Sequence, residues 1–202
     1  TDFDRMYGND GDDHYYVDNV GEEIYDSSGY DTVHINTITR GTYTIPDTLE
    51  AAILVDDSRT DWVIGNDLNN QITGNYFDNI IDGKLGADRM IGGRGPDTYY
   101  VDNIGDEVIE ENVYGVDLVK VKLASYQLPE WVENLNLEGS IKQSGYGNGL
   151  NNTIRNPWGS AEMWGLGGDD ELYGGQYDDI LSGGLGSDHL EGGRGNDVII
   201  YE

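Results

Sequence analysis

The amino-acid sequence predicts an all-β fold, a parallel β-roll or β-helix solenoid with 18 residues in each coil. The first observation is a nine-residue repeat, G-G-x-G-x-D-x-U-x, in which U is a large apolar residue. Each unit reads as a Gly-rich turn followed by a short strand, so two units complete one coil. The second observation is that candidate apolar faces at helical spacing are short or interrupted by Gly, which argues against helices.

Three runs of this repeat are separated by two strand-rich linking stretches that contain VHINTIT and LVKVKL. A slower repeat lies over the nonapeptides, because YYVDNVGEEIY at Tyr15 returns as YYVDNIGDEVI at Tyr99. The first run begins inside a unit and the last stops where a further repeat would begin, so we expect a segment of a longer repeat protein. The predicted organisation is a nonapeptide run at 1–34, linking rungs at 35–64, a run at 65–109, linking rungs at 110–146 and a run at 147–202.

The eighth position of every unit is apolar, which predicts a thin core of stacked side chains inside the solenoid. A solvated Gly/Asp-rich loop would not require this regularity. The predicted core residues are Tyr15, Ile24, Val33, Ile72, Ile81, Met90, Tyr99, Ile154, Met163, Leu172, Leu181, Leu190 and Ile199.

The composition is strongly acidic and excludes several classes of protein. The 202 residues include 11 Lys and Arg against 39 Asp and Glu, a net charge of −28. Such a chain has no basic face for nucleic acid. The absence of Cys excludes disulfides and thiolate metal sites. No apolar run reaches the ~18 residues of a transmembrane segment. Two classes of protein remain: a disordered chain, and a fold whose carboxylates are neutralised by hard cations. The 15 Tyr and 4 Trp residues favour the fold.

The sixth-position carboxylates predict a bound cation. Residues 18 apart lie one strand spacing apart, about 4.8 Å, where two carboxylates repel by roughly 3 kcal/mol at an effective dielectric near 20. The thin core supplies only about 1.5–3 kcal/mol per side chain, and chain ordering opposes it. Ca²⁺ accepts six to eight carboxylate and carbonyl oxygens, whereas Mg²⁺ demands tighter geometry and zinc prefers His or Cys. We therefore expect several calcium ions.

The pattern resembles the RTX proteins, the hemolysin-type calcium-binding nonapeptide-repeat family. The resemblance implies a right-handed parallel β-roll with calcium held between turns by the Asp and turn carbonyls. It also implies a secreted, extracellular or cell-surface protein whose parent leaves the cell through type I secretion machinery.

Carried onto this chain, the resemblance assigns metal ligands in stacked pairs. Asn contributes no charge, so its pairs are expected to be weaker, and the pair of Asp97 with Asp117 departs from the strict spacing. The pairs are Asp4 with Glu22, Asp13 with Asp31, Asp88 with Asp106, Asp97 with Asp117, Asp170 with Asp188, Asp179 with Asp197, Asn70 with Asp88, Asn79 with Asp97 and Asn152 with Asp170.

No catalytic motif stands out, so we expect a calcium-binding module and not an enzyme. The chain has no G-x-S-x-G and no H-E-x-x-H, and paired carboxylates occur too widely to single out one pair. Two alternatives remain. One is an adhesin or polysaccharide-binding module that uses the aromatic ninth positions, Tyr16, Tyr100, Trp164 and Tyr173. The less favoured one is a β-helix enzyme that modifies polysaccharides.

Overall fold

A computed structural model describes residues 3–112 and 115–201 and confirms the all-β prediction. No helix occurs in that part of the chain, and hence none that could cross a membrane. All paired strands run parallel and stack as a β-solenoid with about 18 residues per turn. The chain forms two compact units, one built on residues 3–109 and the other on residues 116–201.

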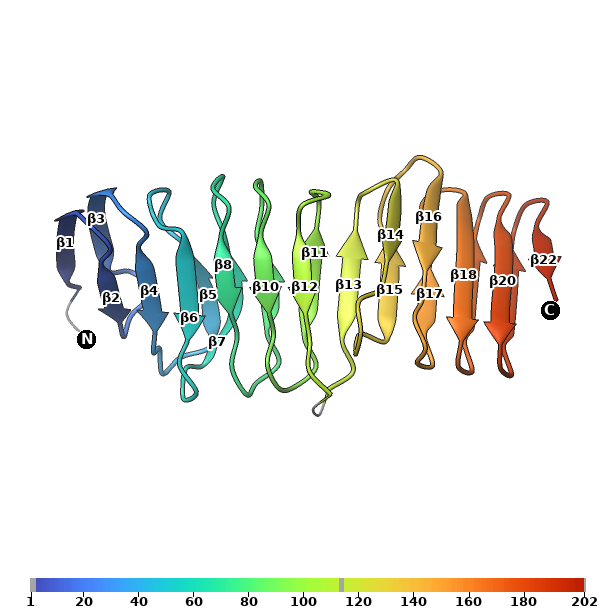
Figure 1. Cartoon of the computed structure of the whole chain (residues 1–202), viewed down its shortest axis with the longest axis horizontal. Helices are drawn as coiled ribbons and strands as arrows, with labels where there is room; N and C mark the ends of the chain where they lie inside the picture. Colours follow the sequence, from blue (N-terminus) through green and yellow to red (C-terminus); the bar gives the residue numbers. More distant parts are fainter. Residues whose placement is uncertain (1–2, 113–114, 202) are drawn as a thin grey trace. The chain divides into compact units, whose positions relative to one another are not determined.

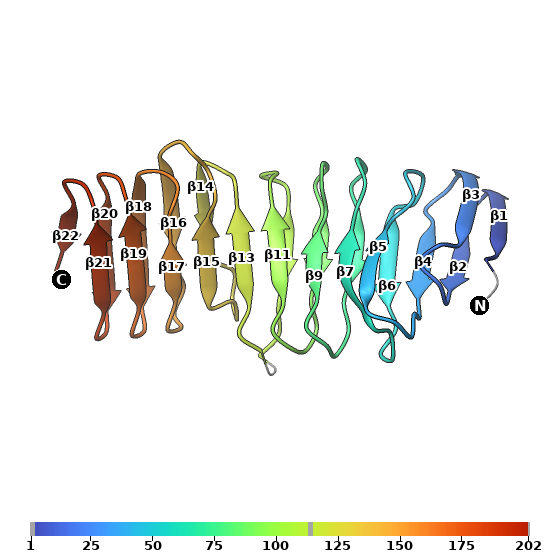
Figure 2. The same ribbon diagram turned by 180° about the vertical axis from the view of Figure 1, so that it is seen from behind.

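The first unit contains twelve strands in three parallel arrays (Figure 1). Two strands at its N-terminal end pair with each other, β1 (Arg5–Asp10) and β3 (Glu23–Ser28). One face is a sheet of β2 (His14–Val17), β4 (Thr32–Ile35), β6 (Ala51–Leu54), β8 (Gln71–Thr73), β10 (Arg89–Ile91) and β12 (Glu107–Ile109). The other face, seen in Figure 2, consists of β5 (Gly41–Thr44), β7 (Thr60–Ile64), β9 (Ile80–Asp82) and β11 (Thr98–Val101).

The second unit has ten strands in two parallel sheets. One sheet, visible in Figure 2, contains β13 (Leu118–Val121), β15 (Asn134–Leu137), β17 (Thr153–Arg155), β19 (Glu171–Gly175) and β21 (His189–Gly193). The other contains β14 (Ser125–Gln127), β16 (Gln143–Tyr146), β18 (Ala161–Gly167), β20 (Ile180–Leu185) and β22 (Val198–Ile200). The chain alternates between the two sheets, so sequential strands lie on opposite faces of the core.

The register follows the nonapeptide period. Ile154 pairs with Leu172 and Leu172 with Leu190, each 18 residues further along the chain. Linking coils depart from this spacing, since Asn134 pairs with Leu118 on one side and with Thr153 on the other. The linking stretches therefore continue the solenoid with coils of slightly different length.

The core consists of the eighth-position side chains, as the sequence predicts. Ten of the thirteen are buried, and Ile24, Leu190 and Ile199 are half-buried in strands at the edges of their sheets. A side chain in an edge strand has a stacking neighbour on one side only, so part of its surface faces solvent. The core is thus one residue wide, and the turns that carry the carboxylates lie directly beside it.

The second position of the turn adopts a left-handed backbone in several units. Gly93, Gly175 and Gly184 adopt φ values of +104°, +107° and +92° there. Lys84 and Leu166 occupy the same position with φ of +69° and +78°, a conformation that costs other residues more than it costs Gly. Lys84 is held by an ion pair of 2.8 Å between its Nζ and Asp82.

Candidate metal centre

The sixth-position carboxylates form ladders along the edges of the solenoid. In each ladder one carboxylate oxygen accepts a hydrogen bond from the backbone N–H of the sixth-position residue one coil earlier. The structure thereby brings together four of the predicted pairs. The distances from N to Oδ1 are 2.8 Å for Asp13 to Asp31, 3.1 Å for Asp88 to Asp106, 2.9 Å for Asp170 to Asp188 and 3.0 Å for Asp179 to Asp197.

The second oxygen of many ladder carboxylates is buried without a hydrogen-bond donor. A buried carboxylate oxygen that lacks a partner lowers the stability of the fold by roughly several kcal/mol, unless a cation or a proton compensates its charge. A metal ligand is the physical role that such an oxygen fits. Oxygens of this kind in the described residues include Oδ2 of Asp13, Asp26, Asp31, Asp88, Asp170 and Asp179.

The first Gly of each unit leaves a cradle beside this oxygen. A Cβ at Gly165 would lie against Asp170 Oδ2 and 2.5 Å from the carbonyl oxygen of Gly183 in the next coil. The same arrangement recurs at Gly174, where the Cβ would meet Asp179 and lie 2.6 Å from the carbonyl oxygen of Gly192. A carboxylate oxygen and a carbonyl oxygen therefore converge on one small space. This donor set fits Ca²⁺, which binds oxygen ligands of both kinds.

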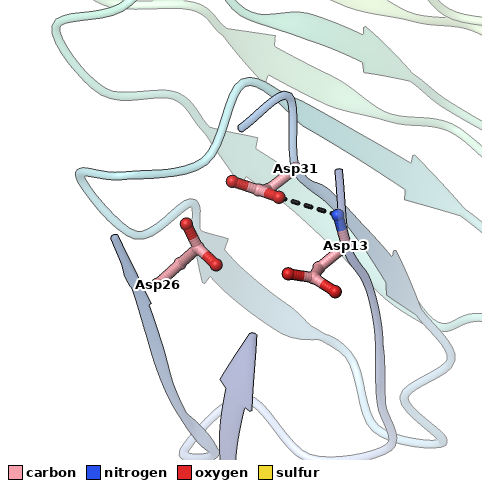
Figure 3. Close-up of side chains that lie close together, drawn as sticks. All are labelled: Asp13, Asp26 and Asp31. Carbon is pink, nitrogen blue, oxygen red and sulfur yellow. Dashed lines mark hydrogen bonds between the residues drawn. The ribbon is translucent and has the colours of Figure 1, made fainter. Parts of the chain in front are cut away.

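One cluster collects three carboxylates. Figure 3 shows Asp13, Asp26 and Asp31 turned toward a shared space, and one oxygen of each lies within 4.8 Å of the others. Asp26 also accepts a hydrogen bond of 2.6 Å from the Tyr15 hydroxyl, which fixes the position of its other oxygen. Asp26 occupies the first position of its unit, where the repeat normally has Gly, so the nonapeptide pattern did not predict it as a ligand.

Sequence reasoning also missed two Glu residues in the linking coils. Glu50 accepts the Asp31 N–H at 2.8 Å, and Glu133 accepts the Asp117 N–H at 2.8 Å. Each extends a carboxylate ladder by one coil where the nonapeptide pattern is absent. A signal for both exists in the sequence, since Glu50 and Glu133 each end a P-x-x-[L/V]-E segment at matching places in the two linking stretches.

The three predicted Asn ligands lie in the ladders but are bonded differently. Their backbone N–H groups donate to the Asp of the next coil, as those of Asp residues do. Their side-chain oxygens already accept a hydrogen bond within their own turn, unlike the orphaned Asp oxygens. The ladder bonds are Asn70 to Asp88 at 2.7 Å, Asn79 to Asp97 at 2.6 Å and Asn152 to Asp170 at 2.7 Å.

Two predicted pairs stay predictions. Asp97 belongs to the first unit and Asp117 to the second, and the structure describes each unit by itself. Asp4 is exposed, whereas Glu22 is half-buried with an unpartnered Oε2. Burial raises the pKa of Glu22, and the nearby carboxylate of Asp18 raises it further.

The aromatic ninth positions are distributed over three sheets. Tyr16 stacks on His34 with ring centroids 4.5 Å apart, and Trp164 stacks on Tyr146 at 4.9 Å. The guanidinium of Arg155 lies 4.8 Å from the centroid of the Tyr173 ring. One face of each of these three rings is therefore covered by a neighbour within its own sheet, and polysaccharide binding stays a prediction.

Burial raises the pKa of the ladder carboxyls. The pKa of Asp88 rises to about 7 because the group is desolvated and lies near the carboxylates of Asp106 and Asp102. Desolvation raises the pKa of Asp170 and that of Asp179 to about 6. Two carboxylates near each group contribute, one in the next coil and one on the preceding residue. Burial also raises the pKa of Asp31. The metal-free fold therefore favours protonated carboxyls at these positions.

We expect the stability of the metal-free protein to fall as pH rises. A carboxyl with a folded pKa above its unfolded value of about 3.9 stabilises the fold fully below that value and loses the contribution as pH rises through 6–7. Far-UV circular dichroism in chelator should therefore show more β structure at pH 5 than at pH 8. A triple variant with Asp88, Asp170 and Asp179 changed to Asn should show a smaller difference. Equal β signals at the two pH values in the unmodified protein would contradict the expectation.

Comparison with protein families identifies the repeats. The model of the RTX calcium-binding nonapeptide repeat matches in four copies, over residues 1–19, 64–99 and 164–199. No curated protein matches the chain. The matched segments contain the Asp88 and Asp179 ladder positions, whose Oδ2 atoms are among the unpartnered oxygens described above. In these segments the chain therefore contains RTX calcium-binding nonapeptide repeats.

Proposed function

We propose that this chain is a calcium-binding β-roll module whose folding and rigidity outside the cell depend on Ca²⁺ held between stacked Gly/Asp turns. The observation that carries the proposal is the set of buried Asp oxygens without hydrogen-bond donors, of which those of Asp170 and Asp179 lie next to a turn carbonyl. When bound, calcium would neutralise these carboxylates and complete their coordination. Asp31, Asp88, Asp170 and Asp179 are the residues that we expect to hold it.

The physical basis of the calcium dependence is the small core. The buried apolar side chains come from only one or two positions in each short strand, while the chain carries a net charge of −28. At low calcium, self-repulsion favours an expanded chain. At a free calcium concentration 100-fold above the dissociation constant, each independent site adds about 2.7 kcal/mol to the free energy of unfolding. Because each coil contacts only its neighbours, folding should spread cooperatively within a unit.

The proposal extends to the setting in which the module works. A chain that stays expanded at low calcium suits passage through a type I secretion channel, and millimolar calcium outside the cell would then fold it. We infer that the protein is secreted or displayed at the cell surface. The family match and the acidic composition support this inference.

The test is far-UV circular dichroism of the purified chain in chelator, titrated with Ca²⁺ and separately with Mg²⁺. We expect a cooperative gain of β signal with calcium and little gain with magnesium, because Mg²⁺ demands near-octahedral geometry and gives up water reluctantly. A β-rich spectrum that chelator leaves unchanged would overturn the calcium-driven folding. An equal response to both ions would overturn the calcium selectivity.

A further inference from the structure

Two of the three sixth-position Asn side chains, those of Asn70 and Asn152, are fully hydrogen-bonded without a metal. Asn70 is buried, and its Oδ1 accepts the Asn66 N–H at 2.8 Å. Its Nδ2 donates to the carbonyl oxygen of Leu49 at 3.1 Å and to that of Glu50 at 3.4 Å. Every polar atom of this side chain therefore has a protein partner.

Asn152 repeats this arrangement in the second unit. Its Oδ1 accepts the Asn148 N–H at 2.8 Å, and its Nδ2 donates to the carbonyl oxygens of Glu133 at 3.1 Å and Val132 at 3.4 Å. The side chain is 1% exposed. The two units therefore share this set of hydrogen bonds, although their linking sequences differ.

A second Asn in the same turn strengthens each junction. Asn66 donates from Nδ2 to the carbonyl oxygens of Pro46 at 2.7 Å and Leu49 at 2.8 Å. Asn148 donates likewise to the carbonyl oxygens of Pro129 and Val132, both at 2.8 Å. Linking-coil carbonyls, the groups that would otherwise be available to coordinate a cation, are therefore already occupied by amide donors. The sequence signature is G-N-x-x-x-N, in contrast to G-G-x-G-x-D.

The position of these amides in the ladders is the same in both units. Asn70 lies between Glu50 of the linking coil and Asp88 of the next coil, and Asn152 lies between Glu133 and Asp170. Toward the linking coil each Asn presents an N–H₂ donor, whereas a ladder Asp presents an acceptor. A cation is repelled by a donor, so this step of each ladder does not fit Ca²⁺.

We propose that the G-N-x-x-x-N rungs are metal-independent junctions, each joining a linking coil to the first calcium-dependent coil of its unit. This revises the prediction that Asn70 and Asn152 are calcium ligands. Each linking coil and its Asn rung would form a block held by amide hydrogen bonds, from which the carboxylate coils fold when calcium is added. The inference rests on the proposed calcium-driven folding and specifies where that folding starts.

Hydrogen exchange in chelator tests the proposal on the intact chain. We expect β6, β8, β15 and β17, which flank the junctions, to exchange about tenfold or more slower than β10, β12, β19 and β21. Calcium should protect the second group and change the first little. Loss of protection in all eight strands in chelator would overturn the junction proposal and leave calcium-driven folding intact. Full protection of all eight in chelator would overturn the proposed function itself.

A matched pair of variants tests the chemistry of the junction. Asn152→Asp would place a carboxylate oxygen against the carbonyl oxygens of Glu133 and Val132. Asn151→Asp makes the same charge change one residue earlier, at an exposed side chain that accepts the Asp169 N–H. We expect N152D to melt at a lower temperature than N151D in chelator, with calcium reducing the difference.

Equal melting temperatures of N152D and N151D in chelator would overturn the proposal. The pair Asn70→Asp and Asn69→Asp repeats the comparison in the first unit, where Asn69 is exposed and accepts the Ala87 N–H. This second pair decides the question if N152D does not fold. The number of bound calcium ions measures metal binding directly, which a melting temperature does not. The unmodified protein and N151D should bind the same number of calcium ions.

Discussion

Changing Gly165 to Ala is expected to remove one calcium ion and to destabilise the second unit. The added Cβ would lie against Asp170 Oδ2 and near the Gly183 carbonyl oxygen, in the space assigned to the cation. Loss of one site costs about 2.7 kcal/mol at 100-fold excess calcium, and overpacking adds roughly 1–3 kcal/mol. Titration calorimetry should count the lost ion, and urea unfolding in calcium should show a decrease of about 3–6 kcal/mol in the free energy of unfolding.

Gly149→Ala is the matched control. It is in the same unit, and a Cβ at this position meets no heavy atom within 4 Å. We expect this variant to bind as many calcium ions as the unmodified protein and to unfold with a similar or slightly higher free energy. If Gly165→Ala kept the full number of calcium ions, the cation would not occupy the cradle beside the first Gly.

The fold could be predicted because its information is local and repeated. The Gly-rich turn, the short strand and the apolar eighth position recur in every unit, and each follows from the conformational freedom of Gly and the two-residue period of a strand. Leu172 and Met163 could be placed in the core from spacing alone, and both are fully buried. Coil length in the linking stretches was less predictable, because the regular G-G-x-G turn is absent there.

The candidate site was predicted where its carboxylates share a sequence position, and carboxylates were missed where they do not. Asp170 and Asp188 occupy the same position of two units, so their stacking follows from the period of 18. Glu50 reaches the ladder from a linking coil, and its role depends on the exact winding of that coil. Asp26 faces Asp13 and Asp31 across the turn, a neighbourhood that only three-dimensional packing establishes.

The Asn residues show a further limit of sequence reasoning. Asp and Asn at one position look like a stronger and a weaker version of the same ligand. In the structure their side chains face different groups, since Asp170 accepts an N–H whereas Asn152 donates to carbonyl oxygens of the linking coil. The partner across the coil decides which residue fits, and that partner is 19 or 20 residues away in an irregular stretch.

Truncating Leu172 to Ala is expected to destabilise the calcium-loaded second unit by about 2–5 kcal/mol. Leu172 is fully buried and stacks between Ile154 and Leu190 in the same sheet. The core is one residue wide, so few side chains are available to move into the cavity. Urea unfolding at saturating calcium measures the loss, while calorimetry should find the number of bound calcium ions unchanged, because no ligand has been altered.

Leu185→Ala separates core packing from a general effect of Leu truncation. Leu185 lies in β20 of the same unit, but its side chain is 78% exposed, so we expect a change within about 0.5 kcal/mol. Equal losses in the two variants would mean that burial at the eighth position does not stabilise the roll. A large loss at Leu172 alone, with all calcium ions retained, would show that the apolar stack and the ions stabilise the solenoid through separate contacts.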